Sequence, residues 1–284
     1  MMIEKIFIPT VNRVENQITY NNLPDTLRKN VVMVVQSWER SLYNYPCEYL
    51  VLPEEINLDD YYCLPKTRLA IYEAGKNIKY AVLDDDLTFG RRNSKYWNGT
   101  SNMEKSKRVA TEEDVIEMFD LYDQWLDDPN ITVCGPGHAE NPPQNKSFTN
   151  NSSLSSAIFV NGNDFSDILP DLELTRVKVA EDAVFLLSLL ARGYGNRVSQ
   201  EFIFHNHSVH KKSMDSTVWD QQTFEQTLRD HKIVESMFPG IFNILYDADG
   251  KRVEGGFRNF GKSRIYWSKA LNSRSATIEE FFND

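Results

Sequence analysis

The sequence is poor in cysteine. Its 284 residues include only Cys47, Cys63 and Cys134, and no two of them form a CxxC pair. An odd number of scattered cysteines predicts neither a disulfide framework nor a zinc site. We therefore expect a protein of a reducing cytoplasm.

Long hydrophobic runs are also lacking. No stretch approaches the ~20 apolar residues that a membrane-spanning helix requires. The first apolar run is broken at Pro9, which predicts a strand rather than a secretory signal. We expect no membrane partner, and the 41% hydrophobic content is enough to fill a sizeable core.

One glycine-rich phosphate-binding motif is absent. GxGxxG does not occur in the chain, which argues against a Rossmann glycine turn. If a diphosphate binds, its charge must be met by a metal ion and by side chains.

Positive charge is scarce overall but locally concentrated. The net charge of −10 argues against non-specific nucleic-acid binding by the whole molecule. Residues 91–108 and 251–275, however, combine Arg and Lys with aromatic residues. Such segments suit phosphate contact and base stacking, although solvated surface segments explain the same composition equally well.

Apolar runs and helical patterns alternate along the first half of the chain, and this order predicts an α/β fold with a mostly parallel mixed sheet flanked by helices. Residues 139–153, rich in Asn, Pro and Ser, predict a loop. We predict strands over 3–8, 31–36, 48–53, 79–86, 131–137 and 155–162, and helices over 39–45, 65–76, 111–126, 181–192 and 223–237.

The predicted strand over 79–86 runs into three consecutive aspartates, Asp84, Asp85 and Asp86. Adjacent carboxylates repel one another, so a divalent cation is an expected partner. Pleat alternation puts Asp84 and Asp86 on one side, where they would form an oxygen-rich site for Mg²⁺ or Mn²⁺, and turns Asp85 away. The alternative is an exposed acidic turn that binds nothing.

Two further groups of residues are candidates for catalysis or metal binding. Glu181 and Asp182 stand at the first turn of an apolar helix, where they either stabilise the helix dipole or present a general base to a cleft. His205, His207 and His210 lie close in sequence, and one of them could complete a carboxylate-bound metal. Surface histidines are an equally good interpretation of each.

Five segments in this order carry a family resemblance: IFIPTVNR, LPKTRLAIYEAG, YAVLDDDLTF, AEDAVFLLSLLARGYGNRV and HNHSVH. They resemble GT-A fold glycosyltransferases, and more narrowly the phage enzymes, associated with TET/JBP-type base oxygenases, that glycosylate hydroxymethylated pyrimidines in DNA. The resemblance implies a GT-A-like catalytic domain over 1–210, with a nucleotide-sugar half (1–90) and an acceptor half (91–210). Residues 211–284 would be a helical and basic extension packed on it.

The resemblance also implies a donor site for a nucleoside-diphosphate sugar, of the UDP-glucose type. Thr10, Asn12 and Arg13 would hold the base and ribose, and Arg68 would approach the diphosphate. Asp85 would support this site.

A Mn²⁺ or Mg²⁺ cofactor is implied beside the diphosphate. Asp86 would bind the ion, Asp84 would contact ribose or metal-bound water, and His205 or His207 would be the remaining ligand. The ion would neutralise charge on the leaving group.

Transfer itself would use Asp182 as general base, with Glu181 in reserve, and would invert the anomeric centre. The implied acceptor is the hydroxymethyl group of a flipped base in double-stranded DNA, in the cytoplasm of an infected bacterium. Arg91, Arg92 and Lys95 would contact its phosphates, and the 139–153 loop could close over it. A glycan or small-molecule acceptor, or a non-catalytic binding module, are the alternatives.

Overall fold

The structure, a computed structural model, describes residues 3–57, 60, 62–93, 107–142, 146–207, 224–251 and 263–273. The strands are β1 Lys5–Pro9, β2 Val31–Val35, β3 Glu48–Val51, β4 Lys79–Leu83, β5 Leu87–Arg92, β6 Lys107–Val109, β7 Ile131–His138, β8 Phe148–Asn150, β9 Ala157–Asn161, β10 Gly195–Asn206, β11 Phe242–Ile244 and β12 Ser263–Ile265. The helices are α1 Ile18–Asn22, α2 Asp25–Arg28, η1 Ser37–Leu42, α3 Cys63–Ala74, α5 Glu112–Trp125, η3 Ser166–Leu172, η4 Leu174–Arg176, α6 Glu181–Ala191, α8 Phe224–Met237 and α9 Trp267–Asn272.

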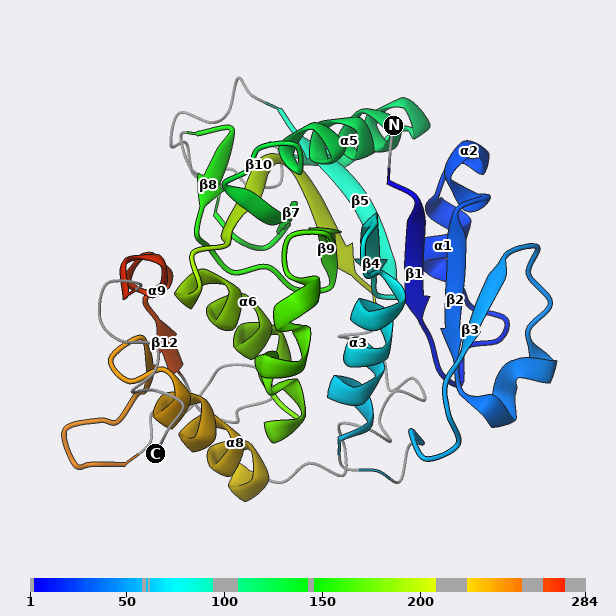
Figure 1. The fold of residues 1–284 in the computed structure, drawn as a ribbon. Coiled ribbons are helices and arrows are strands. Elements are labelled where there is room, and N and C mark those ends of the chain that lie inside the picture. The colour runs from blue at the N-terminus through cyan, green and yellow to red at the C-terminus, as the bar shows by residue number, and fades with distance from the viewer. Residues whose placement is uncertain are drawn as a thin grey trace.

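A large twisted sheet organises these elements (Figure 1). Within the described ranges it has ten strands in the order β3-β2-β1-β4-β9-β7-β10-β5-β6, and β8 pairs with β10. Only β5, β8 and β9 run against the other strands, because each pairs antiparallel with its neighbours. The predicted α/β fold with a mostly parallel mixed sheet is confirmed.

Helices cover both faces of the sheet, which explains the continuous apolar runs in the strands. All five residues of β2 are buried. Val32 and Val34 pack in the core shared with α3 and α6, whereas Met33 packs on the opposite face with α1 and α5. On the first face α3 and α6 lie side by side (Figure 1), with the rings of Tyr72 and Phe185 stacked at 4.4 Å.

Helix α5 begins where its local sequence predicts. The Thr111 hydroxyl accepts the Asp114 backbone N–H, and the Asp114 carboxylate accepts the Thr111 N–H. This reciprocal capping box satisfies two donors that a helix start otherwise leaves without partners.

Three local predictions differ from the structure. Strand β4 ends at Leu83, so the aspartates form a turn between β4 and β5 and do not extend the strand. Strand β7 runs through the Gly-Pro-Gly segment to His138, one residue beyond the predicted 131–137, and it packs closely on β10: a Cβ on Gly137 would lie 2.7 Å from the Ser199 carbonyl oxygen. The predicted 139–153 loop contains β8, which pairs with residues 197–199 of β10.

The described C-terminal elements belong to the same core. Val234 and Met237 of α8, Phe238 directly after it and Ala270 of α9 are buried in the hydrophobic cluster that contains α6. No helix among the described residues is long and apolar enough to cross a membrane.

Candidate active site

The turn formed by Asp84, Asp85 and Asp86 lies between β4 and β5. The Asp84 carboxylate accepts a hydrogen bond from Arg68 on α3 at 2.6 Å. Arg13, which follows β1, donates to Asp85 at 2.6 Å and approaches Asp86 to 3.7 Å. Two arginines from distant segments therefore offset the repulsion among the carboxylates. Pleat alternation does not apply to a turn, and Asp85 and Asp86 share Arg13 while Asp84 pairs with Arg68.

Beside this turn, the end of β1 builds a buried polar network. The Thr10 hydroxyl donates to Asp85 at 2.6 Å and accepts from the Gln17 amide at 2.7 Å. Burial raises the pKa of Asp85 to about 7, against the lowering effects of Arg13 and Thr10. The four predicted donor-site residues of this region, Thr10, Asn12, Arg13 and Asp85, thus lie in one neighbourhood.

Sequence reasoning missed Glu39 in the same network. Its side chain accepts the backbone N–H of Asn12, which adopts a left-handed φ of 56°. Glu39 is only 1% exposed, and burial raises its pKa. The available signal was an acidic residue shortly after the buried strand β2, at the carboxyl edge of the sheet.

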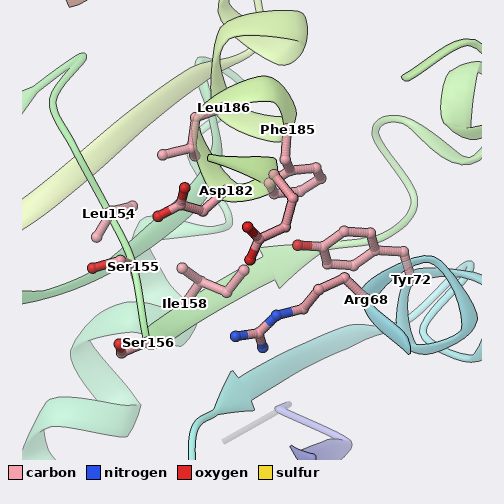
Figure 2. Close-up of a pocket in the computed structure, with 10 residues that line it drawn as sticks. Arg68, Tyr72, Leu154, Ser155, Ser156, Ile158, Asp182, Phe185 and Leu186 are labelled. Atoms are coloured by element: carbon pink, nitrogen blue, oxygen red, sulfur yellow. The ribbon is translucent and has the colours of Figure 1, made fainter. Parts of the chain in front are cut away.

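A pocket opens between α3 and α6 (Figure 2). Arg68 and Tyr72 extend into it from α3, and Asp182 extends from the first turn of α6. The rest of its wall is formed by Leu154, Ser155, Ser156, Ile158, Glu181, Phe185 and Leu186. The pocket therefore combines an apolar wall with an arginine and two carboxylates.

The two carboxylates are electrostatically coupled. Burial, reinforced by the charge of Asp182, raises the pKa of Glu181 to about 8, although Arg68 opposes the shift. Burial also raises the pKa of Asp182, whose Oδ1 accepts the Ala183 N–H at 2.7 Å. Carboxyl groups whose pKa lies near neutrality are suited to proton transfer.

Two backbone positions around this pocket are strained. Ala180, immediately before Glu181, has a φ of 66°, and Ser156 has a φ of 57°. Such left-handed conformations are unfavourable for residues with a Cβ and often occur at functional sites.

The family model of the TET-associated glycosyltransferases matches residues 4–216. The chain belongs to this family. No curated protein matches the sequence.

In this TET-associated glycosyltransferase, Asp86 is contacted by Asn206, which lies between the two predicted histidine ligands. β10 is antiparallel to β5, so Asn206 lies opposite Leu87, directly after the aspartate turn. Its amide donates to Asp86 at 3.4 Å and to Ser156 at 3.2 Å. Asn206 was missed because it is flanked by histidines, although pleat alternation already separates it from both.

The two predicted histidine ligands lie on the other side of the strand end. His207 Nε2 contacts the Thr88 hydroxyl at 2.7 Å, and burial, together with Lys107 and neighbouring histidines, lowers the pKa of His205. Across the described ranges, no three His, Cys, Asp or Glu side chains form a metal-binding group. The predicted set of Asp84, Asp86 and a histidine is therefore not assembled.

The carboxylate oxygens of the aspartate turn are still suitable ligands for a hard cation. Mg²⁺ commonly takes only one or two protein carboxylates and completes its shell with water and substrate phosphates. Asp86 and Asp84 offer such oxygens, and their pairing with arginines shows that positive charge is favoured here.

Arg91 and Arg92 are not exposed beside the site. Arg91 forms ion pairs with Asp114, Glu117 and Glu201. Arg92 is 4% exposed and donates to backbone carbonyls, including that of Asn141 at 2.6 Å. Their placement corrects the prediction of a phosphate-binding surface, because intramolecular acceptors already hold both guanidinium groups. Lys95 lies outside the described residues.

Proposed function

We propose that this glycosyltransferase moves a sugar from a nucleoside-diphosphate sugar of the UDP-glucose type to the hydroxymethyl group of a modified pyrimidine in phage DNA. The observation that carries the proposal is the pocket in which Arg68, paired with Asp84, lies beside Glu181 and Asp182. A cationic group for a diphosphate and a carboxylate for an acceptor hydroxyl thus border one cavity.

The proposed binding site for the nucleotide-sugar donor is based on the polar network after β1. Thr10, Asn12 and Arg13 would hold the nucleoside, and Arg68 would face the diphosphate from α3. Burial lowers the pKa of the Arg68 guanidinium, but Asp84, Tyr72 and Glu181 raise it by more, so Arg68 remains charged. A Mg²⁺ or Mn²⁺ ion at Asp86 and Asp84 would supply further neutralisation of the leaving diphosphate.

Asp182 would act as general base. Its carboxylate would accept the proton of the acceptor hydroxyl as that oxygen attacks the anomeric carbon, which gives inversion in a single displacement. Glu181, whose pKa burial raises to about 8, would donate a hydrogen bond when it is protonated. The apolar residues Ile158, Phe185 and Leu186 would exclude water from the reacting groups.

A DNA acceptor is supported by the TET-associated family rather than by Arg91 and Arg92. The base would have to leave the helix to reach a pocket between two helices. A glycan or small-molecule acceptor is the second candidate, favoured by the acidic net charge of −10.

A donor panel tests the proposal. The protein is incubated with nucleotide sugars, with Mg²⁺, Mn²⁺ or chelator, and with DNA that contains either hydroxymethylated or unmodified pyrimidines. Mass spectrometry of the released nucleosides should detect a hexose-sized mass increase only with hydroxymethylated DNA and a divalent ion. Transfer to a glycan but not to DNA would contradict the proposed DNA acceptor. Full activity in the presence of chelator would contradict the proposed requirement for a metal ion.

A further inference from the structure

A carboxylate on the C-terminal helix α8 contacts the segment that leads into the pocket. Asp230 is fully buried, and its Oδ2 accepts the backbone N–H groups of Lys178 at 2.8 Å and Val179 at 3.0 Å. Two consecutive donors on one charged oxygen make strong hydrogen bonds in a buried setting. Asp230 therefore fixes the backbone two residues before Glu181.

This segment needs an external support. Ala180 connects Val179 to α6 in a left-handed conformation, with a φ of 66°, and no side chain caps the helix start. Such a conformation persists only where surrounding contacts impose it. A small rotation at Ala180 would redirect both Glu181 and Asp182, which occupy the first turn of α6.

Helix α8 is itself firmly held. Val234, Met237 and Phe238 are buried in the core that contains α6, and the His231 ring packs edge-on against Phe242 at 5.5 Å. On the same helix, Glu235 accepts the backbone N–H of Ile244 in β11 at 2.8 Å. The carboxylate of Asp230 thus projects from a rigid element.

We propose that Asp230 is a positioning residue for glycosyl transfer, acting through the backbone of Lys178 and Val179 to hold Glu181 and Asp182 in the pocket. This inference rests on the proposed function of that carboxylate pair. It also places an active-site support beyond the family-matched residues 4–216.

Kinetics of Asp230→Ala, Asp230→Asn and Glu235→Ala test the role. Misplaced catalytic groups lower the chemical step, so kcat should fall about 10- to 100-fold in Asp230→Ala while KM for the donor stays within about twofold. Asp230→Asn keeps one oxygen acceptor and should retain an intermediate kcat. Glu235→Ala loses a carboxylate that contacts β11, and should keep the wild-type kcat per folded molecule.

Hydrogen exchange followed by mass spectrometry separates this inference from the proposed function. Exchange should rise in peptides covering 176–186 in both Asp230 variants, and near Ile244 in Glu235→Ala. Unchanged exchange at 176–186, or raised exchange with an unchanged kcat, would overturn the positioning role. If Asp230→Ala does not fold, Asp230→Asn decides by the same two measurements. An inactive wild type would count against the proposed function alone, and exchange would still show whether Asp230 orders the segment.

Discussion

Glu181 and Asp182 show how neighbouring residues of the same chemistry acquire different roles. Both stand on the first turn of α6, but Glu181 is 8% exposed and has a pKa of about 8, whereas Asp182 accepts the Ala183 N–H, which lowers its pKa and partly offsets burial. The sequence showed an acidic pair at a helix start, which alone favoured the dipole and catalysis equally. The pocket wall and Arg68, which come from distant segments, favour catalysis.

Asp182→Asn should remove transfer and spare donor binding. The amide cannot accept the acceptor proton, so we expect kcat to fall about 10²- to 10⁴-fold. Calorimetric titration with the nucleoside diphosphate should give the wild-type affinity. Asp167→Asn, at an exposed position on η3, is the matched control and should keep full activity. A kcat near the wild-type value in Asp182→Asn would show that another residue is the general base.

The raised pKa of Glu181 predicts a pH-dependent stability. The folded state binds this proton more tightly than the unfolded state, so the free energy of unfolding should fall as pH rises from the ordinary value of 4.5 through about 8. Glu181→Gln should flatten this fall, as measured by urea unfolding between those limits. Glu4→Gln, at an exposed position, should keep the wild-type slope. An identical slope in Glu181→Gln would contradict the buried environment.

Strand β5 connects the aspartate turn to an ion-pair network rather than to an exposed basic surface. Arg91 reaches Asp114 and Glu117 on α5 and Glu201 on β10, and its guanidinium lies 4.9 Å from the centre of the Phe202 ring. These partners are distant in sequence, so the local run of arginines could not reveal them. Sheet pairing between β5 and β10 brings Glu201 beside Arg91, and α5 supplies the other two carboxylates.

Arg91→Ala should therefore act on folding. Removing the cation leaves Asp114, which is 5% exposed, without one of its partners, and we expect a loss of about 2 kcal/mol in the free energy of unfolding. Arg176→Ala removes an exposed i,i+3 pair with Glu173 and should change stability by less than about 0.5 kcal/mol. Urea unfolding measures both. Wild-type stability together with weakened DNA binding in Arg91→Ala would restore the phosphate-binding interpretation.

What the sequence could predict depended on how local the determining contacts are. The start of α5 follows from Thr111 and Asp114, only three residues apart, and was predicted closely. The aspartate turn was recognised as a site, but its arginine partners and Asn206 depend on segments up to 120 residues away. Similarly, β8 forms because β10 offers it an antiparallel partner, which the polar composition of 139–153 does not show.

The candidate active site lies on a sheet that helices cover on both faces. The C-terminal helices α8 and α9 pack on the same face as α6. Because α8 and α9 share the core cluster of α6, the structural unit extends past the family-matched residues 4–216. The site should attract anionic substrates, although the net charge of the whole protein is −10. Cationic side chains near the site must therefore attract these substrates against the repulsive field of the whole protein.

This balance predicts weak binding of DNA with a small but measurable dependence on salt. Each phosphate contact should contribute a slope of about −0.9 to the dependence of log affinity on log salt. With few contacts on an acidic body, we expect a shallow negative slope for hydroxymethylated duplexes from 50 to 200 mM salt, measured by fluorescence anisotropy. Unmodified duplexes of the same sequence should show the same slope with lower affinity, because phosphate contacts do not distinguish the bases. If neither duplex bound measurably at 50 mM salt, the result would favour the small-molecule acceptor, which needs no phosphate contacts.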